Sequence, residues 1–221
     1  MLLHFAIINP WPRISAIDNA LRTEGRSMED KPHWMQVLLL VLGELVFIVI
    51  AIPLYIFLVL PNHPAGSLPG IVPIAAPDAG FALTILYTLL ALALPMALFF
   101  TLYRLFGDSQ FSSQEMLDLA RNYSMLDLGI VYIAAGISEE FLFRGALVEP
   151  CGVIISALLF TALHLAYWKK PLVLVYTFAI GLIWGFFYVL TESLLLCALV
   201  HAIYNFVVTG YIKYKVLPRE A

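Results

Sequence analysis

The segment LDLGIVYIAAGISEEFLFRGALV, residues 126–148, is long enough to cross a bilayer, yet its second half carries Glu139, Glu140 and Arg144. A charge at the centre of a spanning helix costs about 2.5 to 3.5 kcal/mol on insertion scales, so such charges are retained mainly for a use. Two histidines, His164 and His201, follow in later apolar stretches. Carboxylate, guanidinium and imidazole groups that occur together in predicted membrane segments indicate a chemically active site.

The composition of the chain predicts a membrane protein. It has 221 residues, of which 62% are hydrophobic and only 12% are charged, whereas the apolar share is usually roughly 45–50%. A soluble domain of this length could not bury that much apolar surface. Since about 20 residues cross about 30 Å of hydrocarbon, we predict an all-α, polytopic transmembrane helical bundle with about six spanning helices, at residues 34–60, 80–103, 126–148, 152–168, 171–190 and 193–212.

The basic residues predict the orientation of these spans. Of the 12 lysines and arginines, all except Arg144 precede the first span, lie between spans two and three or four and five, or follow the last span. The positive-inside rule therefore places both termini in the cytoplasm, which requires an even number of spans.

The chain divides into four predicted regions. Residues 1–33 form an N-terminal cytoplasmic or interfacial segment, and residues 34–125 form a two-span part with an amphipathic loop. Residues 126–212 form the catalytic membrane core, and residues 213–221 form a cytoplasmic tail. Within the loop 107–122 we expect a short amphipathic helix with Ser113 as its N-cap.

The helical period directs the side chains of the two adjacent glutamates to different sides of the helix. Glu140 and Arg144 are four residues apart, so they share a helix face and can form an ion pair. Glu139 is rotated by about 100° from Glu140, and we predict that it points into the bundle. An inert ion pair that fixes helix packing would account for Glu140 and Arg144, but not for Glu139.

The same spacing of four recurs in two later spans, between Phe160 and His164 and between His201 and Asn205. A lone histidine in a membrane is often a hydrogen-bonding strut between helices. Together with Glu139, however, these residues supply the parts of a hydrolytic site. A carboxylate can take a proton from water, an imidazole can share that water or protonate a leaving amine, and a second histidine with an amide can donate hydrogen bonds to an oxyanion.

The motifs EEFLFR (139–144), FTALH (160–164) and HAIYN (201–205) resemble the signatures EExxxR, FxxxH and HxxxN, in the same order, of the CAAX prenyl protease and bacteriocin-processing (CPBP/Abi) family of intramembrane endopeptidases. The resemblance implies a helical-bundle protease that hydrolyses peptide bonds at a site reached from the cytoplasmic side. Carried over by position, the catalytic residues would be Glu139 and His164, which activate water, and His201 and Asn205, which form an oxyanion hole. The supporting residues would be Glu140, Arg144 and Phe160.

Two versions of the site remain open. Members of the family are often called metalloproteases, and Glu139, His164 and His201 would suit Zn²⁺ with an open fourth position. The alternative needs no cofactor, because Glu139 and His164 activate water directly. Asn205 beside His201 fits an oxyanion hole better than a metal shell, so we favour the metal-free version.

The expected depths of Glu139 and His164 in the membrane constrain how the helices can be arranged. Glu139 lies roughly 20 Å along its span from the cytoplasmic end, whereas His164 lies roughly 8 Å from Lys169, at about 1.5 Å per residue. For these two residues to meet, the helices must tilt, start deeper, or frame a cavity open to the cytosol.

The expected partners are a membrane-anchored protein or peptide substrate and the lipid bilayer, with no nucleic acid. The short chain resembles the prokaryotic members of the family, which implies a prokaryotic cytoplasmic membrane. Two other functions compete with proteolysis. The first is a non-proteolytic membrane scaffold or bacteriocin-immunity factor of the same fold. The second is a proton-coupled carrier, which is disfavoured because the sequence shows no inverted repeat.

Overall fold

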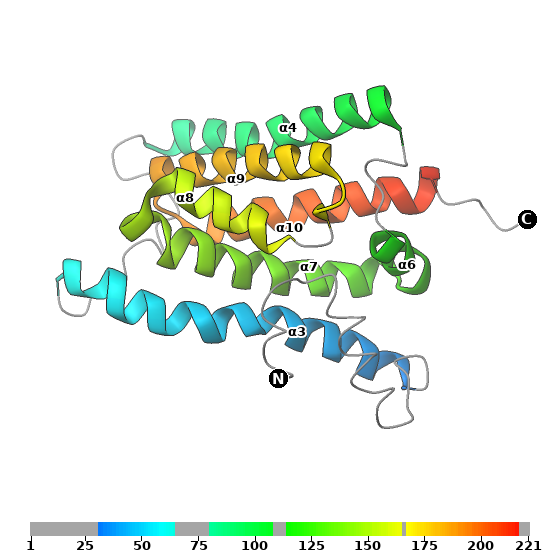
Figure 1. The fold of residues 1–221 in the computed structure, drawn as a ribbon, viewed down its shortest axis with the longest axis horizontal. Helices are drawn as coiled ribbons and strands as arrows, with labels where there is room; N and C mark the ends of the chain where they lie inside the picture. Colours follow the sequence, from blue (N-terminus) through cyan, green and yellow to red (C-terminus); the bar gives the residue numbers. More distant parts are fainter. Residues whose placement is uncertain (1–30, 65–79, 108–113, 165–166, 217–221) are drawn as a thin grey trace, which may run out of the picture.

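The structure is a computed structural model that describes residues 31–64, 80–107, 114–164 and 167–216. These residues form seven α-helices and no β-strand (Figure 1), which confirms the all-α prediction. The helices are α3 (His33–Leu54), α4 (Gly80–Phe106), α6 (Gln114–Asn122), α7 (Met125–Glu140), α8 (Val148–Leu163), α9 (Pro171–Thr191) and α10 (Leu194–Tyr211). Ser113 and almost all of the predicted segment 1–33 lie outside the described residues.

Four of the six predicted spans are helical segments long and apolar enough to cross a membrane: 33–62, 80–106, 171–191 and 194–215. The other two correspond to α7, with its π-helical continuation Phe141–Ala146, and to α8. The chain is an integral membrane protein, whereas the number of spans and the side on which the termini lie remain predictions.

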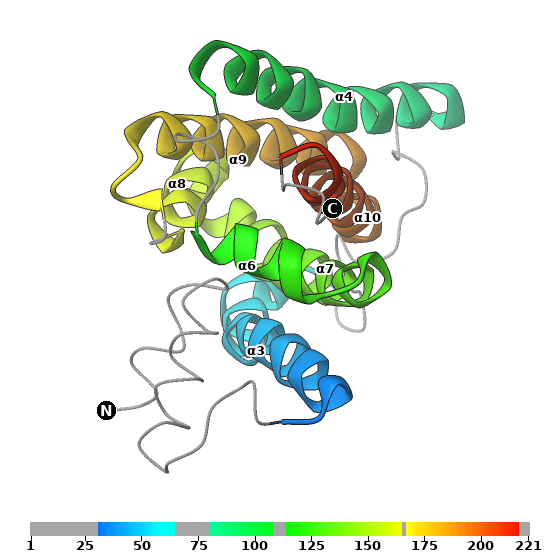
Figure 2. The same ribbon diagram turned by 90° about the vertical axis from the view of Figure 1, so that its right-hand side faces the viewer.

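Helix α7 is the central element of the bundle. It packs against α3 on one side and α10 on the other, and α9 packs against both α8 and α4. Figures 1 and 2 show this stack of helices from two directions. Because α3 and α10 cover two sides of α7, its charged side chains need not face lipid.

The two faces of α7 differ in polarity and in side-chain size, as expected for a helix that contacts lipid on one side. Its outer stripe consists of large apolar residues that are exposed, namely Leu126, Ile130, Ile133 and Ile137. Its buried face carries small and polar residues, among them Gly136, Ser138, Glu139 and Glu140. Small residues let membrane helices approach closely, and polar ones bond between helices, so this inside-out pattern fits lipid as the surrounding solvent.

Glycines allow the closest helix contacts. A Cβ atom on Gly136 would lie 2.6 Å from the carbonyl oxygen of Ala198 in α10. On α9, a Cβ on Gly181 would lie 3.1 Å from the Cβ of Ala157, and one on Gly185 would lie 2.6 Å from Val153 Cγ1. Both of these contacts are with α8. Gly181 and Gly185 are four residues apart on one face of α9, and together they let α9 pack closely against α8.

Helix α6 lies across one end of the bundle (Figure 2). The side chain of Lys213, in the π-helical segment Ile212–Val216, donates hydrogen bonds to the backbone oxygens of Ala120 and Tyr123 at the end of α6. An ammonium group at a helix C-terminus satisfies carbonyls that have no partner within the helix. The short helix predicted in the loop 107–122 is therefore present.

The same end of the bundle holds all of the described lysines and arginines except Arg144. It holds the starts of α3, α7 and α9 and the ends of α4 and α10 (Figure 1). Its basic residues are Lys31, Arg104, Arg121, Lys169, Lys170, Lys213 and Lys215. This agrees with the charge asymmetry that predicts the orientation.

Helix α8 is broken near its start and ends early. Gly152, in the predicted turn EPCG, has φ of +81° and interrupts the helix, a conformation that glycine adopts without steric cost. The helix then ends at Leu163, five residues before the end of the predicted span. Near this end of α8, the ring of Phe160 lies 5.0 Å from the ring of Phe143 and 6.4 Å from the ring of His201 in α10.

We predict that Gly136→Ala destabilises the protein by about 1–3 kcal/mol, because the added methyl group forces α7 away from α10. The matched control is Gly129→Ala on the same helix, where a Cβ would lie 3.5 Å from the ring of Phe206, an ordinary contact. The control gains helix propensity by up to about 1 kcal/mol. Thermal unfolding in detergent measures both variants, and equal melting temperatures for the two would contradict the prediction.

Candidate active site

A cavity of about 110 Å³ lies inside the bundle and contains most of the residues singled out by the sequence. Glu139 of α7, Phe160 of α8, His164 just after α8, and His201 and Asn205 of α10 all line it. Glu140 and Arg144 do not. The early end of α8 explains how residues of different expected depth meet, because it brings His164 to the level of Glu139.

Glu140 and Arg144 form the predicted ion pair, with 3.0 Å between Glu140 Oε1 and Arg144 Nη1. Both side chains are at most 1% exposed. Arg144 lies in the π-helical segment that continues α7, and its Nη2 donates to the backbone oxygen of Gly181. Its guanidinium carbon is also 4.8 Å from the centre of the Phe160 ring and 5.8 Å from that of Trp184. Arg144 therefore joins α7, α8 and α9 around one buried charge.

His201 lies between the two glutamates. Its Nδ1 is 2.8 Å from Glu140 Oε1, and its Nε2 is 4.0 Å from Glu139 Oε2. A carboxylate in an ion pair with an arginine can only accept hydrogen bonds, so Nδ1 of His201 carries a proton and donates it to Glu140. Nε2 is then the atom of His201 that faces Glu139.

His164 is oriented by the end of α8. Its Nδ1 is 2.6 Å from the backbone oxygen of Phe160, which can only accept, so Nδ1 is again the donor. In the neutral ring, Nε2 is then the nitrogen that can take a proton. The ring also lies between Phe160, at 4.4 Å between centroids, and Tyr167, at 5.9 Å.

Phe160 contacts most of the polar groups of the site. Its ring lies against the guanidinium of Arg144 and the rings of His164 and His201. An aromatic face attracts a cation and excludes water from the ion pair. The supporting position that the motif assigns to Phe160 therefore has a physical basis in these contacts.

A proline in α4 helps to hold the far wall of the cavity. Pro95 has no N–H, so the carbonyl of Ala91, four residues earlier, lacks its usual helical partner. Trp184 Nε1 donates to this carbonyl at 3.0 Å, and the indole lies 4.6 Å from the ring of His201. Tyr176 donates to the oxygen of Pro95 and also hydrogen-bonds Tyr204.

In the described part of the chain, no group of three or more His, Cys, Asp or Glu side chains is placed so that it could hold a metal ion. Glu139, His164 and His201 share the cavity, yet they do not form a ligand set for zinc in this structure.

Sequence reasoning missed several residues of the cavity. The most informative is Glu44 of α3, which is only 6% exposed and lines the cavity with Glu139. The insertion-cost argument that draws attention to Glu139 applies equally to Glu44 in the segment VLGELVF. Tyr132, Trp184 and Tyr204 also line the cavity, but aromatic residues are too common in this chain to be recognised from sequence.

Residues 121–207 match the family model described as type II CAAX prenyl endopeptidase Rce1-like. This segment is similar to the Rce1-like family of type II CAAX prenyl endopeptidases. It contains all three motifs and every predicted site residue, which confirms the resemblance to CAAX-type membrane proteases. Neither the curated proteins nor the solved structures contain a match to the chain. The Rce1-like segment covers less than half of the chain, and residues 1–120 lie outside it.

We predict that Arg144→Met destabilises the Rce1-like segment by about 3–5 kcal/mol, because it leaves the carboxylate of Glu140 buried without its cation. Removing the charge as well, in Glu140→Gln/Arg144→Met, should recover part of this loss. Thermal unfolding of the two variants in detergent measures the difference. A double variant no more stable than Arg144→Met would show that the buried charge is not the cause.

Proposed function

We propose that this chain is an intramembrane endopeptidase that hydrolyses peptide bonds of membrane-associated proteins or peptides. One observation carries the proposal. Within the Rce1-like segment, Glu139, His164, His201 and Asn205 come from three parts of the sequence and line one cavity. The function of the family at the level of peptide hydrolysis supports the same assignment.

In this mechanism a water molecule lies between Glu139 and Nε2 of His164. Glu139 takes a proton from the water, and the resulting hydroxide attacks the carbonyl carbon of the substrate. The hydrogen bond from Nδ1 to the Phe160 oxygen holds the His164 ring with Nε2 available for the water. When the tetrahedral intermediate collapses, the C–N bond breaks and the proton passes to the leaving amine.

His201 and Asn205 stabilise the oxyanion. The amide of Asn205 can always donate, whereas Nε2 of His201 donates only when the ring is an imidazolium, because Nδ1 already donates to Glu140.

Substrate reaches the cavity from the basic end of the bundle. Leu40 of α3 and Met116 and Leu119 of α6 line the cavity, and α6 lies at that end (Figure 1). The positive-inside rule assigns this end to the cytoplasm. The short chain favours a prokaryotic cytoplasmic membrane as its location.

We predict that Glu139→Gln lowers cleavage by about 10²–10⁴-fold, because a carboxamide cannot take the proton of the attacking water. The matched control is Glu192→Gln, which removes an exposed carboxylate at the turn between α9 and α10. Membranes of a host that lacks the chain are complemented with wild type or either variant, and protein N- and C-termini are mapped by mass spectrometry. New termini should appear with wild type and Glu192→Gln only.

Identical termini for wild type and Glu139→Gln would contradict proteolysis. If both also restored the host phenotype, the non-proteolytic scaffold or immunity factor would replace it.

We predict that cleavage does not depend on zinc. Dialysis of the purified protein against a chelator should leave its activity unchanged, and elemental analysis should find far less than one zinc per chain. Loss of activity on chelation, restored by added Zn²⁺, would instead establish a metal site.

A further inference from the structure

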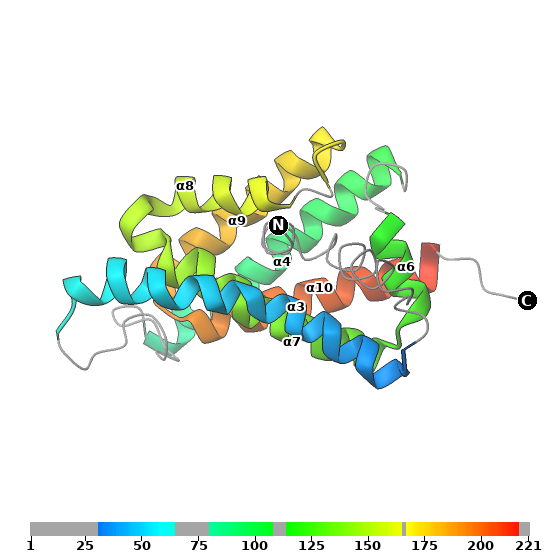
Figure 3. The same cartoon turned by 60° about the horizontal axis from the view of Figure 1, so that its bottom comes forward.

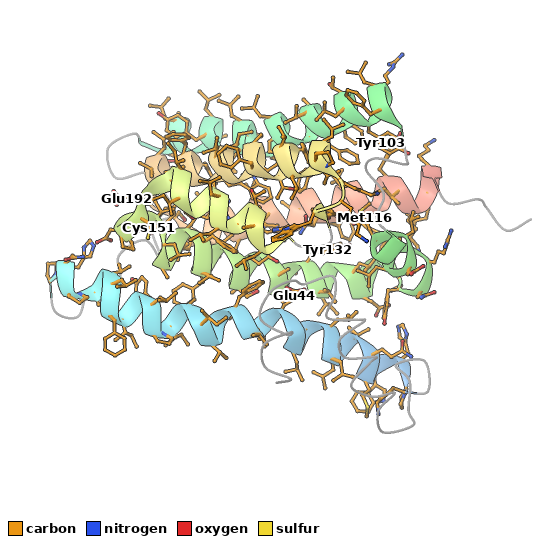
Figure 4. The ribbon with its side chains drawn as sticks, in the orientation of Figure 1. Glu44, Tyr103, Met116, Tyr132, Cys151 and Glu192 are labelled. Atoms are coloured by element: carbon orange, nitrogen blue, oxygen red, sulfur yellow. The ribbon has the colours of Figure 1, made fainter. Side chains whose placement is uncertain are left out.

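Helix α4 lies outside the Rce1-like segment, yet it is bonded to the wall of the cavity. It packs beside α9 (Figures 1 and 3), and side chains fill the space between the two helices (Figure 4). Pro95 of α4 has no N–H, so it removes the usual helical partner of the Ala91 carbonyl. Both residues are buried, and a buried carbonyl within a membrane must be satisfied by another group of the protein. Trp184 of α9 does this, because its Nε1 donates to the Ala91 oxygen at 3.0 Å.

This hydrogen bond orients the indole. Nε1 is the only polar atom of the Trp184 side chain, and its partner is a backbone oxygen that the helix holds in place. The indole also meets the ring of Tyr204 edge to face, with 5.5 Å between centroids and 77° between planes. In this orientation it lies against His201, with ring centroids 4.6 Å apart and planes 35° apart.

One hydrogen bond does not fix the ring of His201. Its Nδ1 donates to Glu140 Oε1 at 2.8 Å, which holds one edge of the ring but lets the ring turn about the line of the bond. Such a turn would move Nε2, the atom that faces Glu139. The indole of Trp184 lies against the imidazole, and the ring of Phe160 stands at 78° to it at 6.4 Å. The indole therefore resists the turn that the hydrogen bond alone permits.

We propose that Trp184 is a positioning residue for His201, and that the Ala91 carbonyl, left available by Pro95, holds Trp184 in place. The inference rests on the proposed endopeptidase function, in which Nε2 of His201 stabilises the oxyanion. A donor is effective only when it is aimed at the place where the oxyanion forms, so a displacement of Nε2 slows the chemical step. Because this interaction forms in the transition state, its loss lowers kcat rather than raising KM.

Two substitutions release Trp184 in different ways. Trp184→Phe keeps an aromatic ring but removes the N–H that bonds Ala91. Pro95→Ala changes no residue that lines the cavity, and it restores to α4 an N–H that competes with Trp184 for the same carbonyl. We expect Trp184→Phe to lower kcat by about 10–100-fold and Pro95→Ala by about 3–10-fold, each with KM unchanged. The substrate is a synthetic peptide that spans a cut mapped with wild type.

Thermal unfolding in detergent separates positioning from a purely structural role. Trp184→Phe should melt about 2–10 °C lower, because a buried carbonyl loses its donor. The double variant Pro95→Ala/Trp184→Phe gives this carbonyl a helical partner, so it should regain stability while its kcat stays as low as that of Trp184→Phe. Recovery of kcat together with stability would show that Trp184 only supports the fold, and would overturn the proposal. Wild-type kcat in Trp184→Phe or in Pro95→Ala would overturn it as well.

The matched controls are Trp34→Phe and Pro53→Ala, because both residues are exposed and lie in α3. Both variants should keep the kcat and KM of wild type, and an equal fall in kcat for either one would count against a specific role of Trp184. None of these results removes the endopeptidase, because cuts absent with Glu139→Gln still occur. Termini that do not differ between wild type and Glu139→Gln would overturn the function and the positioning role together.

Discussion

The structure depends on the burial of the ion pair between Glu140 and Arg144, with His201 as its third member. A charge in a membrane interior is stable only when other groups replace its water. Arg144 therefore needs a carboxylate, a backbone oxygen and aromatic faces, and these come from α7, α8 and α9. One buried cation thus fixes the positions of three helices, and its carboxylate partner binds His201 of a fourth, α10.

This constraint also organises the reactive groups. Because Glu140 holds Nδ1 of His201, the other nitrogen of the ring faces Glu139 and the cavity. The carbonyl of Phe160 has the same effect on His164. In both histidines, a buried hydrogen-bond acceptor binds Nδ1 and leaves Nε2 directed at the cavity. Glu140 and the Phe160 carbonyl therefore determine which nitrogen of each histidine can take part in the reaction, although neither acceptor contacts the substrate.

Lipid as the surrounding solvent explains the rest of the packing. Large apolar residues gain little from leaving lipid for the interior of the bundle, so many of them face outward, and the closest helix contacts are made at small residues. Gly136, Gly181 and Gly185 provide these contacts. Between these closely packed helices lies the small cavity, which is lined by side chains drawn from all seven helices of the described chain.

The sequence by itself determined the helical class, the membrane environment, the pairing of Glu140 with Arg144 and the residues of the three motifs. These follow from local spacing and from the cost of placing charge in lipid, which are properties of single segments. Only the tertiary structure decided which motif residues share a cavity, how early α8 ends, and that Trp184 lies against His201. Those facts depend on the register between helices distant in sequence, and register is set by side-chain contacts that no single segment contains.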